Sequence, residues 1–214
     1  MLSKADDYPI HQSPEPIAYA GQSRNFYDRY FFNGYDIEGD VFFALGMGIY
    51  PHVDVVDAGF SLIRNGVQHD LLCSRALGME RMDTQVGNIK VEVVEPLQSL
   101  RLLIDAPEHG IEADLLFTGR APAQEEPRFT RRLGSQLFMD YTRLTQNGHW
   151  EGWIKHQGER INVAPVRWLG TRDRSWGIRP IGERDAQANP SAEPFQQFYW
   201  LWAPINWGDA VTLY

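Results

Sequence analysis

Alternation of apolar and polar residues with a period of two constrains this chain more than any other feature. Such alternation places one set of side chains on each face of a half-buried strand. Three runs show it in succession, separated by short breaks rich in turn-forming residues: 89–93, 100–105 and 111–115. Closely spaced runs of this kind predict an antiparallel meander. Because almost no segment has the period of a helix, we predict an all-β, lipocalin-like antiparallel barrel or sandwich.

Two Asn-Gly pairs give the strongest local signals for turns. A type I′ hairpin needs positive φ at both central residues, and Asn-Gly tolerates that conformation best. Asn65-Gly66 is predicted to join strands at 58–64 and 67–72. Asn147-Gly148 is predicted to join strands at 138–145 and 149–155.

Charge and composition exclude several classes of partner. The formal charge is −8 and the acidic residues are dispersed, whereas nucleic-acid binding needs a clustered basic surface. One cysteine, Cys73, excludes an internal disulfide. No stretch approaches the roughly 20 apolar residues of a membrane helix, and the first 19 residues contain no apolar block typical of a signal peptide. We therefore expect a cytoplasmic protein with neither nucleic acid nor a membrane span.

Composition also suggests a division of the chain. We predict a poorly ordered N-terminal arm at residues 1–23, a lipocalin-like β domain at 24–183 and a linker at 184–194. Residues 195–214 are aromatic and strand-like, so they either start a second β domain or close the first sheet. An exposed aromatic strand needs a partner. We expect that partner to be a second lipocalin-like domain, in which case the chain is part of a longer protein, or a second copy.

The segment 165–180 contains the highest density of candidate functional side chains. It contains Trp168 and Trp176, four arginines and a single acid, Asp173. Neighbouring arginines lower the pKa of a carboxyl group and an apolar pocket raises it, so Asp173 is either a structural anion or a proton donor. No phosphate loop, dinucleotide fingerprint or zinc-binding helix is present, and the six histidines are scattered. We expect no metal and no cofactor.

Four segments together resemble a known family: residues 30–36 (Tyr-Phe-Phe-Asn-Gly-Tyr-Asp), 48–52, 170–177 and 200–206. They are similar to the hallmarks of the carotenoid-hydratase-like, or AttH-like, family, which includes hydroxyneurosporene synthases. The resemblance implies two lipocalin-like barrels in tandem and a natural length beyond Tyr214. It also implies that Asp173 and Trp176 correspond to an Asp-His-x-Trp segment whose aspartate protonates an isoprenoid double bond. Arg174 replaces the histidine of that segment.

These observations lead to a functional hypothesis. We expect the chain to bind a small apolar molecule, such as an isoprenoid, steroid or polyketide, in a barrel cavity. Acid-assisted hydration, isomerisation or cyclisation would use Asp173 as the acid, with Arg172 and Arg174 beside it. The alternatives are a binding protein without chemistry and an interaction module that uses the aromatic surface of 195–207. The residues predicted to contact the ligand are Trp168, Trp176, Tyr35, Phe43, Tyr50 and Trp202.

Overall fold

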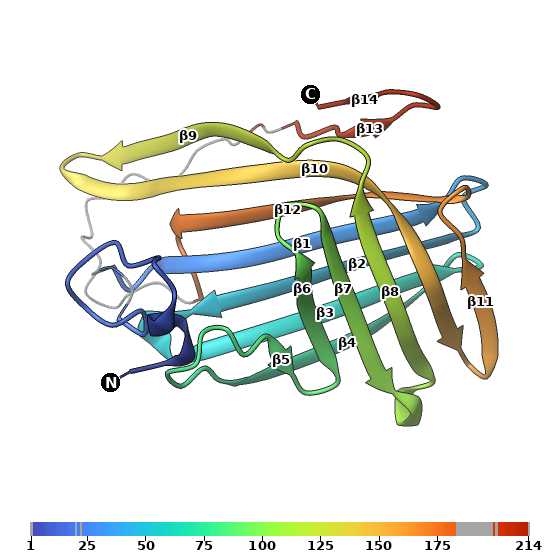
Figure 1. The fold of residues 1–214 in the computed structure, drawn as a ribbon, viewed down its shortest axis with the longest axis horizontal. Helices are drawn as coiled ribbons and strands as arrows, with labels where there is room; N and C mark the ends of the chain where they lie inside the picture. The colour runs from blue at the N-terminus through green and yellow to red at the C-terminus, as the bar shows by residue number, and fades with distance from the viewer. Residues whose placement is uncertain (1, 20, 22, 183–198, 200, 214) are drawn as a thin grey trace.

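A computed structural model of the chain describes residues 2–19, 21, 23–182, 199 and 201–213. Twelve strands form one sheet, and every pairing is antiparallel (Figure 1). Its strands are β1 (Phe26–Asp36), β2 (Val41–Tyr50), β3 (Val55–Arg64), β4 (Val67–Ala76), β5 (Gln85–Val86), β6 (Ile89–Glu95), β7 (Ser99–Ala106), β8 (Ile111–Gly119), β9 (Gln124–Leu133), β10 (Gln136–His156), β11 (Glu159–Val163) and β12 (Trp168–Ile178). A small separate sheet pairs β13 (Ile205–Asn206) with β14 (Val211–Thr212). The described helical turns are three short 3₁₀ segments, Lys4–Asp7, Pro51–Val53 and Pro107–His109.

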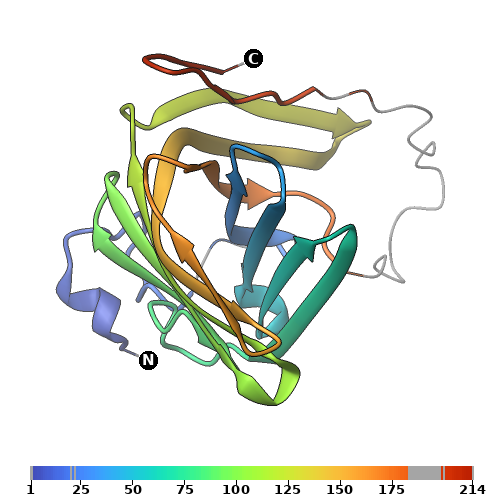
Figure 2. The same cartoon turned by 90° about the vertical axis from the view of Figure 1, so that its right-hand side faces the viewer.

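The large sheet wraps around a single core. Its strand order is β4-β3-β2-β1-β12-β10-β8-β7-β6-β5, with β9 and β11 also paired to the long strand β10. The edge strands β4 and β5 are joined by the side chain of Arg75, which donates hydrogen bonds to the carbonyl oxygens of Asp83 and Gln85, both at 2.8 Å. The two views show the curved sheet closing on itself (Figures 1 and 2). The predicted lipocalin-like β fold is therefore confirmed. No helix among the described residues has the length and apolar character needed to cross a membrane.

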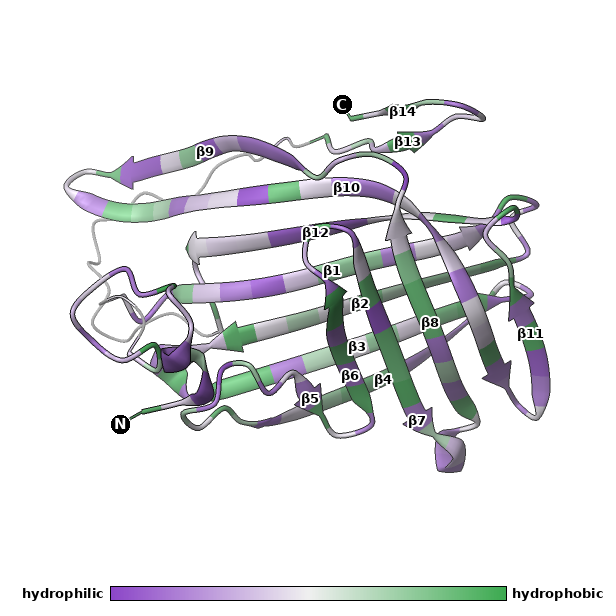
Figure 3. Ribbon diagram, in the orientation of Figure 1, coloured by the Kyte–Doolittle hydropathy of each residue, from purple (hydrophilic) through white to green (hydrophobic). Residues whose placement is uncertain are grey.

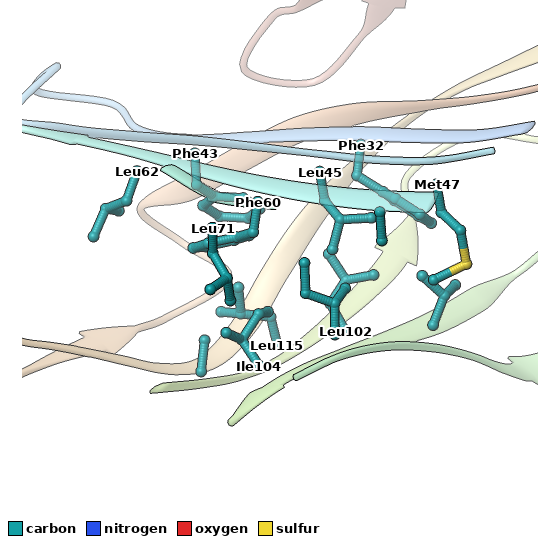
Figure 4. Packing of buried hydrophobic residues seen from close by; sticks show 14 of the residues in the cluster. Phe32, Phe43, Leu45, Met47, Phe60, Leu62, Leu71, Leu102, Ile104 and Leu115 are labelled. Atoms are coloured by element: carbon teal, nitrogen blue, oxygen red, sulfur yellow. The ribbon is translucent and has the colours of Figure 1, made fainter. Parts of the chain in front are cut away.

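The core lies between two walls of this curved sheet. Phe43 and Leu45 from β2 and Phe60 from β3 point toward Leu102 of β7 and Leu115 of β8 (Figure 4). All five side chains are fully buried. Apolar and polar residues alternate along β7 and β8, so each strand gives one face to this core (Figure 3). Burying a side chain of this size contributes about 1.5–3 kcal/mol to folding.

A row of three glycines makes room for two large core side chains, those of Trp150 and Phe117. Gly34, Gly170 and Gly148 stand opposite one another on β1, β12 and β10. A Cβ atom would lie 2.9 Å from Nε1 of Trp150 at Gly34, and 2.5 Å from the same atom at Gly170. At Gly148 it would lie 2.2 Å from the ring of Phe117. The row is therefore needed for close packing and not for turn geometry.

The two Asn-Gly predictions have opposite outcomes. Asn65 (φ 54°) and Gly66 (φ 75°) form the turn between β3 and β4, so that hairpin is confirmed. The hairpin predicted at Asn147-Gly148 is wrong, because both residues lie inside β10 and pair with β12. Neither has positive φ. Gly148 is required at its position by the nearby ring of Phe117, which leaves no space for a Cβ atom.

The C-terminal residues pack against the outside of the barrel. Arg120 donates hydrogen bonds to the side-chain oxygen of Asn206 at 3.2 Å and to the carbonyl oxygen of Trp207 at 2.9 Å. Tyr199 and Trp207 remain 87% and 52% exposed. The predicted linker at 184–194 lies outside the described residues, as do 195–198 and 200. The predicted domain boundary and the hypothesis of an interaction surface at 195–207 therefore stay predictions.

Candidate ligand pocket

A pocket of about 1170 Å³ lies at one end of the barrel, beneath the N-terminal arm. Its floor comes from the start of β1, the end of β12, the end of β2, the strand β6 and the loop that precedes β5. Its roof comes from arm residues between Ala5 and Gly21. Figure 1 shows the arm lying across this end of the barrel. The pocket is thus formed between the barrel and a segment that precedes its first strand.

The arm makes polar contacts with the barrel. The backbone N–H of Lys4 donates to the carboxylate of Glu80 at 3.0 Å, and Arg81 donates to the carbonyl oxygen of Ile17 at 3.1 Å. Within the arm, Asp6 accepts hydrogen bonds from the backbone N–H groups of Ser3 and Ile17. These N–H groups hold the pKa of Asp6 far below its usual range. The carboxylate of Asp6 therefore fixes the loop that covers the pocket.

One carboxylate inside the pocket binds two arginines. Asp28, on β1, accepts hydrogen bonds from Arg174 of β12 and from Arg81, the latter at 3.3 Å. The Arg174 guanidinium lies over the ring of Tyr30 at 4.3 Å and near that of Trp176 at 5.8 Å. Cations over aromatic faces are attracted by the ring quadrupole. The pocket thus combines charged groups with aromatic surface.

The segment 168–178 is a strand, so its predicted site residues point in two directions. Side chains of a strand alternate between its faces. Arg174 and Trp176 line the pocket on the inner face. Arg172 is on the same face and buried, where its Nε donates to Gln146 at 2.8 Å. Asp173 lies on the outer face, so the structure does not bring the candidate acid together with either neighbouring arginine.

Asp173 is buried on that outer face, with 3% of its surface exposed. Its Oδ1 lies 3.6 Å from Nη2 of Arg29, which is an ion pair at long range. Removal of the carboxyl group from water raises its pKa, and this effect outweighs the opposing charges of Arg29 and Arg143. Burial therefore favours the neutral acid.

The remaining predicted ligand contacts lie away from the pocket. Phe43 and Trp168 are buried in the core, where their rings stack with centroids 6.2 Å apart. Tyr35 accepts a hydrogen bond from Asn206 at 3.3 Å on the outer face. Tyr50 alternates with the core-facing residues of β2 and so lies on its outer face, where burial raises its pKa. Trp202 contacts Phe31 edge to face at 6.1 Å and donates to Thr145 at 3.3 Å.

Most of the pocket-lining residues were not predicted from the sequence. Phe26, Asp28 and Tyr30 line it from alternate positions of β1, and Arg81 lines it from the loop before β5. The sequence of β1 does indicate a site, because Asp28 places a charged group on the same strand face as the aromatic residues Tyr30 and Phe32. No local signal marks Arg81, which reaches Asp28 across 53 residues of chain.

Comparison with known proteins places the chain in a family but gives it no activity. The model of a family of unknown function, DUF8625, matches residues 2–214. The chain belongs to this family. No curated protein matches this DUF8625 member.

Solved structures resemble the DUF8625 chain in fold. Kievitone hydratase from Nectria haematococca has a TM-score of 0.49 and 16% identity, over 70% of this chain and 47% of its own. CghA with Sch210972 has a TM-score of 0.49 and 12% identity, over 72% of this chain and 46% of its own. The DUF8625 chain thus spans about half the length of the structures it matches.

Proposed function

We propose that the protein binds a small, largely apolar molecule in the pocket beneath the N-terminal arm. The observation that carries this proposal is the pocket itself, whose volume is about 1170 Å³. Small-molecule sites are typically concave, mostly apolar and roughly 300–1,000 Å³ in volume, with a few polar groups that orient the ligand. β-Barrels of about eight strands can enclose one small ligand. An isoprenoid, steroid or polyketide skeleton has suitable dimensions.

The lining favours an apolar molecule with one polar end. Phe26, Trp176, Ile49 and Val91 supply apolar surface from four different strands. Asp28, Arg81 and Arg174 form one charged cluster in the pocket. A ligand body would cover the apolar side chains while its polar end meets the charged cluster.

Filling the pocket should remove binding. We expect the neutral fluorescent probe N-phenyl-1-naphthylamine to bind the wild-type protein, and Ile49→Trp to weaken its binding at least about tenfold, because the larger ring occupies ligand volume. Ile49 lines the pocket at the end of β2. Fluorescence titration measures both affinities. Leu72→Trp is the matched control, since Leu72 is 79% exposed on β4. Equal loss of binding in both variants, or no binding by the wild type, would contradict the proposal.

Acid chemistry at Asp173 is the second candidate function. What supports it is a buried carboxyl group with a raised pKa, held 3.6 Å from Arg29. A neutral carboxylic acid can protonate a double bond, which is the first step of hydration, isomerisation or cyclisation. Because Asp173 faces away from the pocket, its substrate would lie on the outer face of β12. The resemblance of the segment around Asp173 to the AttH-like family supports this second candidate.

Asp173→Asn tests whether the acid is held neutral. The group has a folded-state pKa above its unfolded value, so it stabilises the fold at low pH and this contribution is lost as pH rises through the folded pKa. We expect the Asn variant to be more stable than the wild type at neutral pH, with the difference vanishing as pH falls toward 3.8. Urea unfolding at several pH values measures this. A less stable Asn variant at neutral pH would instead show that Asp173 is an anion paired with Arg29.

A further inference from the structure

Positive charge exceeds negative charge where β1 and β12 form the wall of the pocket. Asp28 is shared by two guanidinium groups, those of Arg81 and Arg174. Two residues from Arg174 on the same face of β12, Arg172 is 3% exposed and its Nη2 has no hydrogen-bond partner in the described part of the protein. Arg172 itself does not line the pocket, so the pocket wall has two cations, Arg81 and Arg174, for the one carboxylate of Asp28.

The other charged groups of the pocket do not correct this imbalance. Lys90 and Glu92, both on β6, pair with each other at 2.5 Å. Glu15 belongs to the arm and is exposed to solvent. Neither acid contacts the guanidinium groups of Arg172 or Arg174 in any hydrogen bond or ion pair of the described residues. The excess positive charge thus stays at the inner wall.

Burial makes this excess costly. Removal from water lowers the pKa of Arg172 to about 10, and that of Arg174 to about 10. Charged groups taken out of water are stabilised when they acquire a counter-ion with good hydrogen-bond geometry. Guanidinium groups match carboxylates best, because their N–H donors form parallel bonds to both oxygens. An incoming carboxylate would supply what the protein lacks here.

We propose that the ligand is an amphipathic carboxylic acid, whose carboxylate lies beside Arg174 and Arg81 and whose apolar body covers Phe26 and Trp176. This inference rests on the proposed binding function and adds the chemical class of the ligand to it. Asp28 has a positioning role, since it holds the two guanidinium groups close together. The N-terminal arm covers the bound molecule.

Competition between two ligands with alkyl chains of equal length, one with a carboxylate and one with a hydroxyl group, tests the inference. Decanoate and decanol are used at neutral pH to displace N-phenyl-1-naphthylamine from the full-length protein. A pocket without an anion site would prefer decanol, because burying a carboxylate is unfavourable. We expect decanoate to bind at least about tenfold more tightly, as charged hydrogen bonds allow.

Variants of one arginine locate the effect. Arg81→Gln should reduce the preference for decanoate over decanol to roughly one, while Arg81→Lys should retain part of it. Arg132→Gln is the matched control, because Arg132 is exposed on β9, where it donates a hydrogen bond to the carbonyl oxygen of Ser135. Thermal melts show whether each variant is folded. The wild-type preference remains decisive if Arg81→Gln does not fold.

The outcomes separate this inference from the proposed function. If the probe binds but decanol competes as well as decanoate, the inference is overturned and the binding function stands. If the probe does not bind and calorimetry with decanoate shows no heat, both fail. A preference for decanoate that survives Arg81→Gln unchanged would overturn the assignment of the carboxylate to this arginine.

Discussion

Replacing Gly170 with alanine should destabilise the protein by about 3 kcal/mol, at the upper end of the range for overpacked cores. The new Cβ atom would lie 2.1 Å from the carbonyl oxygen of Asn33 and 2.5 Å from Nε1 of Trp150. These two atoms also form a hydrogen bond with each other, at 2.9 Å. Backbone on a paired strand cannot move aside, so the substitution must displace the largest core side chain. Urea unfolding measures the loss.

Gly46→Ala is the matched control for this prediction. Gly46 also lies inside a strand, β2, but a Cβ atom there meets nothing within 4 Å and its φ is not positive. We expect its stability to be unchanged or raised by up to about 1 kcal/mol, because alanine restricts the unfolded chain. Equal stability of the Gly170→Ala and Gly46→Ala variants would contradict the packing role assigned to the glycine row.

Deleting residues 2–19 should abolish binding in the pocket while the barrel stays folded. These residues supply most of the roof. The hydrophobic core cluster, in contrast, starts at Phe32 and contains no residue of the arm. We therefore expect a melting temperature close to that of the full chain, together with at least about a tenfold loss of affinity for N-phenyl-1-naphthylamine. Differential scanning calorimetry and fluorescence titration measure the two effects.

Two results would contradict the role of the arm as a roof. Unchanged affinity would show that the probe binds elsewhere. A collapse of the melting temperature would show that the arm contributes to the stability of the barrel, which its absence from the core cluster argues against.

The fold was largely predictable because strand alternation is a local signal. The meander β6-β7-β8 and the Asn65-Gly66 hairpin follow from residues adjacent in sequence. Asn147-Gly148 is the same dipeptide, but its glycine is there for a different reason. The ring that leaves no space for a Cβ atom at Gly148 belongs to Phe117, 31 positions away. Sequence alone does not show that such a ring is close.

The pocket was less predictable because its parts come from distant segments. Trp176 and Arg174 were recognised from the density of their own segment, and both line the pocket. Asp173 was grouped with them because it is adjacent in sequence, yet a strand turns adjacent side chains to opposite faces. Asp28 and Arg81 join the pocket only through the pairing of β1 with β12 and the path of the loop before β5.

A crystal structure of the protein with decanoate brominated at its terminal carbon tests the central claim most directly, because anomalous scattering locates the bromine without interpretation of weak density. We expect one bromine peak beneath the N-terminal arm, near Trp176 and Val91, in the pocket formed with β6 and β12. A bromine peak on the outer face beside Trp202 and Asp173, with an empty pocket beneath the arm, would contradict it.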